Sequence, residues 1–194
     1  MNPTSNQAFP SSEELRQELK RVRYKNRFRR ILKSTFYTLI VVAAIAALIA
    51  TLVLPVLQIA GTSMEPTLSD GDLVLLVKTD RLKQGDLCAF YYSNKVLIKR
   101  VIGLPGDYIS IDGAGNIYVN SELLEEPYIT EKALGECDID FPYQVPENHY
   151  FLVGDQRATS IDSRSSVIGC VPKDQLIGKL LCRFWPLADF RWVA

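Results

Sequence analysis

The hydrophobic pattern of the chain changes once, close to residue 57. Residues 34–60 carry no charged side chain. The run 36–57 is apolar except at three positions, Tyr37, Thr38 and Thr51. It exceeds the ~20 residues that a helix needs to cross a bilayer, and it is longer than the ~7–15-residue apolar core of a cleaved secretory signal. The pattern therefore predicts a retained transmembrane anchor helix over residues 34–57, with Pro55 near its end.

From residue 58 onward, short apolar runs alternate with Gly, Pro, Asn and Asp. Runs of this length and composition, bounded by turn-forming residues, predict β-strands. We expect strands at Leu73–Val77, Leu87–Tyr92, Val96–Ile102, Tyr108–Ile111, Ile117–Val119, Tyr150–Val153 and Leu176–Phe184. In this part of the chain only Ser121–Glu126 has a pattern that favours a helix. The predicted fold class is mainly β, with an antiparallel β-sheet domain over residues 58–194 and a single N-terminal transmembrane helix.

Charge is distributed unevenly, although the formal net charge is zero. Residues 1–33 hold nine Lys and Arg and three Asp and Glu, which gives +6, and residues 34–194 hold the other 13 and 19, which gives −6. Because Lys and Arg are enriched on the cytoplasmic side of membrane spans, residues 1–33 are predicted to be cytoplasmic and residues 58–194 extracytoplasmic. A nucleic-acid-binding role is disfavoured, since the basic cluster abuts a span and the rest of the chain is acidic.

The four cysteines do not have the spacing of a zinc site, and the only histidine is His149. An extracytoplasmic location permits disulfides. Cys88 and Cys182 lie in apolar strand-like runs and are expected to be buried thiols. Cys137 and Cys170 lie in loop-like sequence and could pair, a question that the sequence leaves open. The sequence predicts no metal and no cofactor.

Two residues suggest nucleophilic chemistry beside a membrane. Ser63 follows the apolar run, and Lys99 lies 36 residues later. A serine hydroxyl needs a base, and a lysine, with a free pKa of ~10.4, becomes one when apolar surroundings lower that pKa. In a strand, Lys99 shares a face with Leu97 and Val101. The alternative is a solvent-facing lysine, the usual case. His149 is the other candidate base, but its position predicts a strand-edge side chain.

Four sequence blocks, in this order after the apolar run, resemble those of bacterial type I signal peptidases, which are membrane-anchored serine–lysine proteases. The blocks are Ser63-Met64-Glu65-Pro66-Thr67-Leu68, Gly71-Asp72, Lys99-Arg100-Val101-Ile102-Gly103-Leu104-Pro105-Gly106-Asp107, and Gly154-Asp155 through Ser160-Ile161-Asp162-Ser163-Arg164. Any one block alone is a weak signal, whereas four ordered blocks behind an anchor are specific.

The resemblance implies a role for each matching residue. Ser63 would be the nucleophile and Lys99 the general base, oriented by Ser160. Asp162 and Arg164 would form a structural ion pair beside them. The backbone N–H of Ser63 would donate to the oxyanion. This chain departs from the family at two positions. Gly61 replaces a hydroxyl residue that supplies a second oxyanion donor in some members, and Gln156 replaces the usual Asn.

The resemblance also implies a substrate and a location. Shallow apolar pockets would accept small residues at −1 and −3 of the cleavage site, lined by Leu57, Ile59, Met64, Leu68, Ala89, Leu97 and Ile98, although a core position is the simpler interpretation for such residues. The preprotein would pair as an added strand along the Lys99 strand. The partners implied are signal peptides of exported preproteins and membrane lipid, with the secretion machinery as a candidate, in the bacterial cell membrane.

Two other functions fit parts of the sequence. A self-cleaving repressor-type protease shares the serine–lysine chemistry and a related β-fold, but the span and the lack of a DNA-binding domain argue against it. A catalytically inactive, membrane-anchored binding protein on the same scaffold is the other alternative. The joint presence of Ser63, Lys99 and Ser160 argues against an inactive protein.

Overall fold

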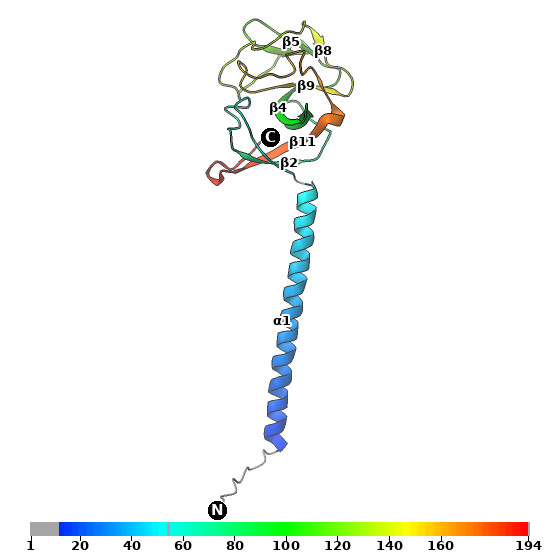
Figure 1. The fold of residues 1–194 in the computed structure, drawn as a ribbon, viewed down its shortest axis with the longest axis vertical. Helices are drawn as coiled ribbons and strands as arrows, with labels where there is room; N and C mark the ends of the chain where they lie inside the picture. Colours follow the sequence, from blue (N-terminus) through cyan, green and yellow to red (C-terminus); the bar gives the residue numbers. More distant parts are fainter. Residues whose placement is uncertain (1–11, 54, 194) are drawn as a thin grey trace, which may run out of the picture. The chain divides into compact units, whose positions relative to one another are not determined.

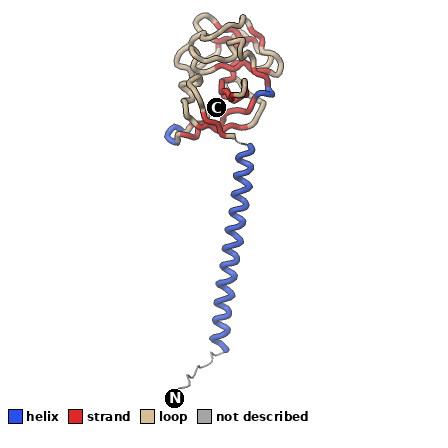
Figure 2. The backbone as a smooth tube through the Cα atoms, viewed as in Figure 1, coloured by secondary structure: helices blue, strands red, loops and turns tan. Residues whose placement is uncertain are grey.

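The computed structural model of the protein describes residues 12–53 and 55–193, so the first 11 residues of the predicted segment 1–33 lie outside it, as does Ala194. The chain divides after Ala50 into a helical unit and a β-rich unit. Helix α1 runs from Ser12 to Val53, so it forms the described part of the first unit and continues three residues past its end (Figures 1 and 2). It therefore begins well before residue 34, because Arg, Lys, Gln and Glu are also good helix formers.

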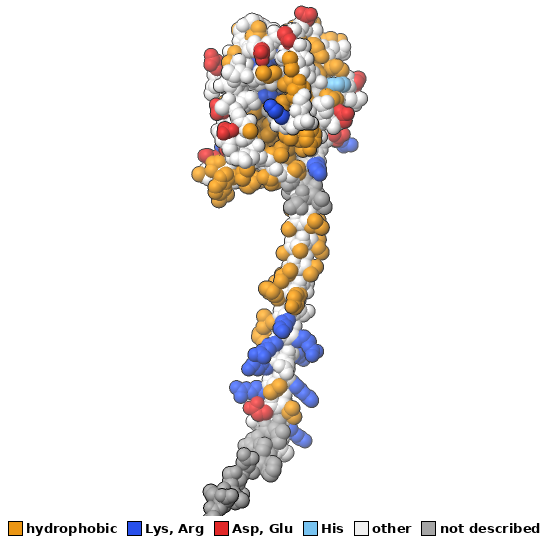
Figure 3. Space-filling model, viewed as in Figure 1, with side chains coloured by type: hydrophobic (Ala, Val, Ile, Leu, Met, Phe, Trp, Pro, Cys, Tyr) orange, Lys and Arg blue, Asp and Glu red, His pale blue; other side chains and the backbone are white. Residues whose placement is uncertain are grey.

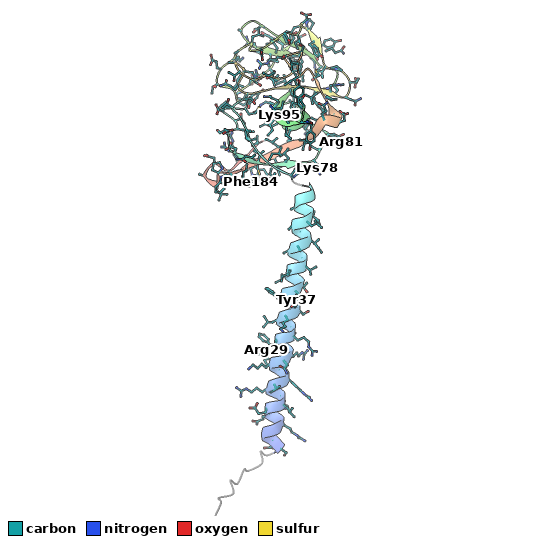
Figure 4. All side chains as sticks on the ribbon, viewed as in Figure 1. Arg29, Tyr37, Lys78, Arg81, Lys95 and Phe184 are labelled. Atoms are coloured by element: carbon teal, nitrogen blue, oxygen red, sulfur yellow. The ribbon has the colours of Figure 1, made fainter. Side chains whose placement is uncertain are left out.

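Helix α1 has a basic part and an apolar part along its length (Figure 3). The labelled side chains Arg29 and Tyr37 project outward from these two parts (Figure 4). Over residues 34–53 the helix carries no charge and is about 30 Å long at about 1.5 Å per residue, which matches the hydrocarbon core of a bilayer. Among the described residues this is the one helix that is long and apolar enough to cross a membrane.

The β-rich unit contains a large antiparallel sheet that confirms the predicted fold class (Figure 2). Its strand order is β1-β2-β11-β3-β4-β9-β10, with β12 beside β11. The strand bounds are β1 Val56–Gln58, β2 Leu73–Val77, β3 Leu87–Tyr92, β4 Lys95–Gly103, β9 His149–Val153, β10 Val171–Pro172, β11 Leu176–Trp185 and β12 Arg191–Trp192. Two short 3₁₀ helices, η1 Lys173–Gln175 and η2 Leu187–Asp189, flank β11. Leu57 belongs to β1, and not to the helix that was predicted to end there.

A smaller antiparallel sheet packs at one end of the unit, where Figure 1 labels β5 and β8. Its order is β7-β6-β5-β8, with bounds β5 Tyr108–Ile111, β6 Ile117–Val119, β7 Glu122–Leu123 and β8 Tyr143–Gln144. The prediction of a helix at Ser121–Glu126 is wrong. Asn120 and Ser121 have φ values of 52° and 73°, which form a two-residue hairpin turn and pair Val119 with Glu122.

The core consists of three clusters of buried apolar side chains. One of them includes Ile59, Met64 and Leu68, which anchor the segment between β1 and β2. A second includes Cys88 and Val101 from β3 and β4, and the third joins β4 and β9 to the smaller sheet. The apolar residues on either side of Ser63 and Lys99 therefore pack into the core, and this packing fixes the backbone around both residues.

All four cysteines are free thiols. Cys88 and Cys182 are buried, as predicted. The pairing of Cys137 with Cys170, which the sequence left open, does not occur. Cys170 packs against the third core cluster, and burial raises the pKa of its thiol to about 11. It is therefore held as a neutral thiol, which is poorly reactive towards oxidation.

Candidate active site

Ser63 lies in a tight loop between β1 and β2. Backbone hydrogen bonds close the base of this loop, from Ile59 N to Asp72 O at 2.8 Å and from Gly71 N to Ile59 O at 3.0 Å. Met64 is 2% exposed and Leu68 is fully buried. Because both side chains point into the core, the loop turns Ser63 toward β4 and leaves it half-buried.

Lys99 lies near the middle of β4, opposite Cys88 of β3. Its side chain is 3% exposed, so the alternative of a solvent-facing lysine is wrong. The Lys99 Nζ atom donates to Ser63 Oγ at 2.8 Å and to Ser160 Oγ at 3.0 Å. The amine thus lies between two hydroxyl groups that come from distant parts of the chain.

The environment of Lys99 favours its neutral form. Burial lowers the pKa of Lys99 to about 8, because an ammonium loses hydration in apolar surroundings. The Asp162 carboxylate opposes this shift, while the Arg164 guanidinium adds to it. A lysine with this pKa is partly neutral near neutral pH and can accept a proton from a serine hydroxyl.

The loop after β9 brings Ser160 to this amine. Gln156 connects the two serines through its backbone, since its N–H donates to Ser63 O at 3.1 Å and its carbonyl accepts from Ser160 N at 3.1 Å. Gly154 lies between the same serines. A Cβ atom on Gly154 would lie 2.1 Å from Ser160 Oγ and 2.7 Å from Ser63 O. Only glycine fits there without displacing one of them.

Asp162 and Arg164 form a buried ion pair below this loop. The Arg164 Nε donates to Asp162 Oδ1 at 2.8 Å, and its Nη2 donates to Asp162 Oδ2 at 2.9 Å. The same guanidinium donates to the carbonyls of Leu134 at 2.8 Å and Ser160 at 3.3 Å. Asp162 also accepts from the Gly154 N–H at 3.0 Å. The pair therefore holds the backbone on both sides of Ser160.

A second buried ion pair joins the three segments that carry Ser63, Lys99 and Ser160. The Arg100 guanidinium donates to both carboxylate oxygens of Asp155, at 2.8 Å and 2.6 Å. Thr67, from the Ser63 loop, donates to the same carboxylate. The guanidinium also lies 3.8 Å from the centre of the Tyr128 ring, a cation–π contact. No role was predicted for Thr67 or Tyr128, because no local pattern in the sequence marks these contacts.

A hollow of about 90 Å³ lies beside Ser63, between β1 and β4. Of the predicted pocket residues, five line it, namely Leu57, Ile59, Met64, Leu97 and Ile98. Leu68 and Ala89 do not line it, because both are fully buried in the core. Four further residues that line the hollow were not predicted, namely Gln58, Ala60, Gly61 and Val96. No local pattern marks them, because alternation along β1 assigns Gln58 to the face opposite Leu57.

Two backbone N–H groups near Ser63 differ in their availability. The Ser63 N–H has no hydrogen-bond partner within the described chain. The Gly61 N–H, by contrast, donates to Asp70 Oδ1 at 2.7 Å. Gly61 has a φ of 92°, in the region that favours glycine. The Ser63 N–H is therefore free to donate to an oxyanion.

His149 does not take part in this arrangement. It lies at the start of β9, where the sequence predicted a strand-edge side chain, and its Nδ1 is 2.8 Å from the carbonyl oxygen of Glu147. In the part of the chain that the structure describes, no group of three or more His, Cys, Asp or Glu could hold a metal ion. The chemistry that the geometry supports is nucleophilic attack by a serine with a lysine as base.

Comparison with known proteins identifies the family of the chain. The family model for signal peptidase, peptidase S26, matches residues 32–185. The chain belongs to the bacterial type I signal peptidases. The self-cleaving repressor alternative is thereby set aside, and the resemblance noted in the sequence is confirmed.

Individual type I signal peptidases cover most of the chain. Signal peptidase I of Bacillus licheniformis is 34% identical over 166 residues, which cover 79% of this chain and 88% of its own. A probable signal peptidase I-2 of Synechocystis is 35% identical over 162 residues, which cover 77% and 72%. A solved signal peptidase I of Enterococcus faecalis, 28% identical, covers 52% of this chain and 97% of its own with a TM-score of 0.42.

Proposed function

We propose that Ser63 and Lys99 are the nucleophile and the general base with which this signal peptidase removes signal peptides from exported preproteins. The observation that carries the proposal is the buried Lys99 Nζ, which lies 2.8 Å from Ser63 Oγ and 3.0 Å from Ser160 Oγ. Ser160 orients the amine, and the Asp162–Arg164 pair holds the loop that presents Ser160.

The reaction would proceed through an acyl-enzyme. Neutral Lys99 takes the proton of the Ser63 hydroxyl while Ser63 Oγ attacks the carbonyl carbon of the −1 residue. The Ser63 N–H donates to the oxyanion that forms. Lys99 then gives its proton to the leaving amine of the mature protein, and the C–N bond breaks. A water molecule, deprotonated by Lys99, hydrolyses the ester and frees Ser63.

The hollow beside Ser63 supports a preference for small residues at −1 and −3. Its volume of about 90 Å³ is roughly that of three water molecules in the liquid. Most of the side chains that line it are apolar, and Gln58 and Ser63 are the polar ones. A methyl group fits such a space, whereas a large or charged side chain loses hydration or overlaps the walls.

The edges of β1 and β4 support binding of the preprotein as an added strand. Residues 95–99 of β4 pair with β3, and pairing with β9 starts at Arg100. β1 is the edge strand of the large sheet and pairs only with β2 among the described strands. Unpaired backbone groups on both strands could therefore bond the main chain of an extended peptide.

The anchor supports a location in the bacterial cell membrane, with residues 1–33 cytoplasmic and the β-rich unit extracytoplasmic. The basic part of α1 precedes its apolar part, which is the charge bias of a cytoplasmic flank. Bilayer lipid would surround the apolar part, and the secretion machinery that delivers preproteins is a candidate partner.

The test uses the detergent-solubilised full chain and a preprotein with Ala at −3 and −1. Ser63→Ala and Lys99→Ala should both abolish cleavage, whereas Lys95→Ala, an exposed lysine on the same strand, should cleave at the parent rate. Thermal unfolding would show that all three variants are folded. Cleavage that survives in folded Lys99→Ala would exclude Lys99 as the base. A folded parent that never cleaves would favour the inactive binding protein.

A further inference from the structure

The loop that follows β9 buries its polar residues and exposes its largest apolar one. Six polar or charged side chains between Asp155 and Arg164 are 2% exposed or less, namely Asp155, Arg157, Ser160, Asp162, Ser163 and Arg164. Ile161, in contrast, is 49% exposed. This reverses the usual distribution, in which isoleucine is among the most buried residues and charged residues are exposed. The buried polar side chains hold the loop together, so the exposed isoleucine needs a separate explanation.

The position of Ile161 is fixed by its two neighbours. Ser160 and Asp162 both point inward, to Lys99 and to Arg164, so Ile161 projects outward beside them. Ser63 Oγ and Ser160 Oγ are at most 5.8 Å apart, because Lys99 Nζ lies 2.8 Å from the first and 3.0 Å from the second. Ile161 is therefore one residue away from a group in the immediate surroundings of the scissile bond.

The proposed reaction places the mature protein on this side of Ser63. The hollow that would hold the −1 and −3 residues includes no residue of the loop after β9. The leaving amine must approach Lys99 Nζ to receive its proton, and Ser160 Oγ contacts that same atom. The chain that follows the leaving amine therefore passes over Ser160 and its exposed neighbour.

We infer that Ile161 is a specificity-determining residue that contacts the first residues of the mature protein and favours an apolar side chain at +1 over a charged one. An apolar +1 side chain gains by covering the exposed isoleucine, whereas a carboxylate there would lose water without a partner. This inference rests on the proposed function, since it assumes that Ser63 attacks the scissile carbonyl with Lys99 as its base.

The test measures kcat/KM for preproteins that share a signal sequence with Ala at −3 and −1 and carry Leu, Asp or Lys at +1. The parent should cleave the Leu substrate about five- to tenfold better than the Asp substrate, and Ile161→Ala should remove most of that difference. Ile161→Asp should favour Lys over Asp. For each variant, the kcat/KM values of two substrates are compared as a ratio. A change in the ionisation of Lys99 affects both values equally and therefore leaves the ratio unchanged.

Val167→Ala is the matched control, because Val167 is a β-branched residue, 66% exposed, soon after the same loop. It should keep the parent ratio. A parent without preference at +1, or an unchanged ratio in active Ile161→Ala, would overturn the inference. An equal loss of kcat/KM on all three substrates in Ile161→Ala would also overturn it, because such a loss would come from a change in the loop and not from a contact with the +1 side chain. Failure of the proposed function is separate, since the parent would then cleave none of the substrates after the −1 Ala.

Discussion

Replacing Gly154 with alanine should slow the enzyme through a single added methyl group. Gly154 has no positive φ, so the backbone accepts alanine without strain. The added Cβ would, however, lie 2.1 Å from Ser160 Oγ, 2.6 Å from Ser160 Cβ and 2.7 Å from Ser63 O. Ordinary contacts of a Cβ are 3.4–4 Å. One or both serines must therefore move by about 1 Å.

The size of the effect follows from the contacts that such a movement breaks. Lys99 Nζ donates to Ser160 Oγ at 3.0 Å. When Lys99 is protonated, this is a hydrogen bond to a charged group, and such bonds contribute about 1.5–3 kcal/mol. With about 1.4 kcal/mol for each tenfold change in rate, kcat should fall about 10- to 100-fold. Overpacking at this position should also lower the free energy of unfolding by about 1–3 kcal/mol.

The assay compares kcat and KM on the Ala-substituted preprotein with the urea midpoint of the same samples. Gly113→Ala is the control, because a Cβ on Gly113 meets nothing within 4 Å. Gly113→Ala should leave kcat, KM and the urea midpoint at the parent values. If Gly154→Ala kept the parent kcat and stability, Gly154 could not be packed closely against Ser160 and Ser63.

Three further predictions concern buried charges. Because only neutral Lys99 accepts a proton and its pKa is about 8, kcat/KM should rise about tenfold per pH unit below pH 8 and level off above it; a flat profile from pH 6 to 8 would contradict this. Since the folded pKa lies below the unfolded value of 10.5, the unfolded chain holds more protons from pH 8 to 10.5. The free energy of unfolding of the parent should therefore rise across that window relative to that of Lys99→Met, because Cys88, Cys170 and Tyr128, whose pKa values are raised by burial, titrate alike in both proteins; thermal unfolding would show this. Glu126→Gln should lower the free energy of unfolding by about 3–5 kcal/mol, because it leaves the buried Arg157 without its carboxylate partner. The exposed neighbour Glu125→Gln should change it by less than about 0.5 kcal/mol in the same urea titration.

The strands that could be predicted are those whose sequence carries its own signal. Leu73–Val77 and Leu87–Tyr92 were predicted with the bounds that β2 and β3 have, because apolar runs between turn residues bury a face of a sheet. The two-residue strands β7, β8, β10 and β12 were missed. At that length the periodicity is too short to read, and pairing with a distant strand decides the conformation.

Prediction of the site was uneven for a related physical reason. Ser63, Lys99 and Ser160 belong to local blocks, and the structure brings them together. Leu68 and Ala89 were predicted to line the hollow, but both lie in the core. Strand register and loop packing decide which way such side chains point, and local sequence does not specify either. The Arg157–Glu126 pair joins positions 31 residues apart, and long-range ion pairs leave no periodic pattern in the sequence.

The arrangement of the buried cations supports the proposed role of Lys99 as a base. Of the four buried cations in the described chain, the three arginines each have a carboxylate partner, in the pairs Arg100–Asp155, Arg157–Glu126 and Arg164–Asp162. Lys99 contacts only hydroxyl groups through its Nζ atom. Because a carboxylate beside an ammonium raises its pKa, the arginines engage the acids that would otherwise keep Lys99 protonated. A carboxylate in place of Ser160 would hold the amine in its charged form. The Ser160 hydroxyl contacts the amine without adding that negative charge, which is what the proposed role of Lys99 requires.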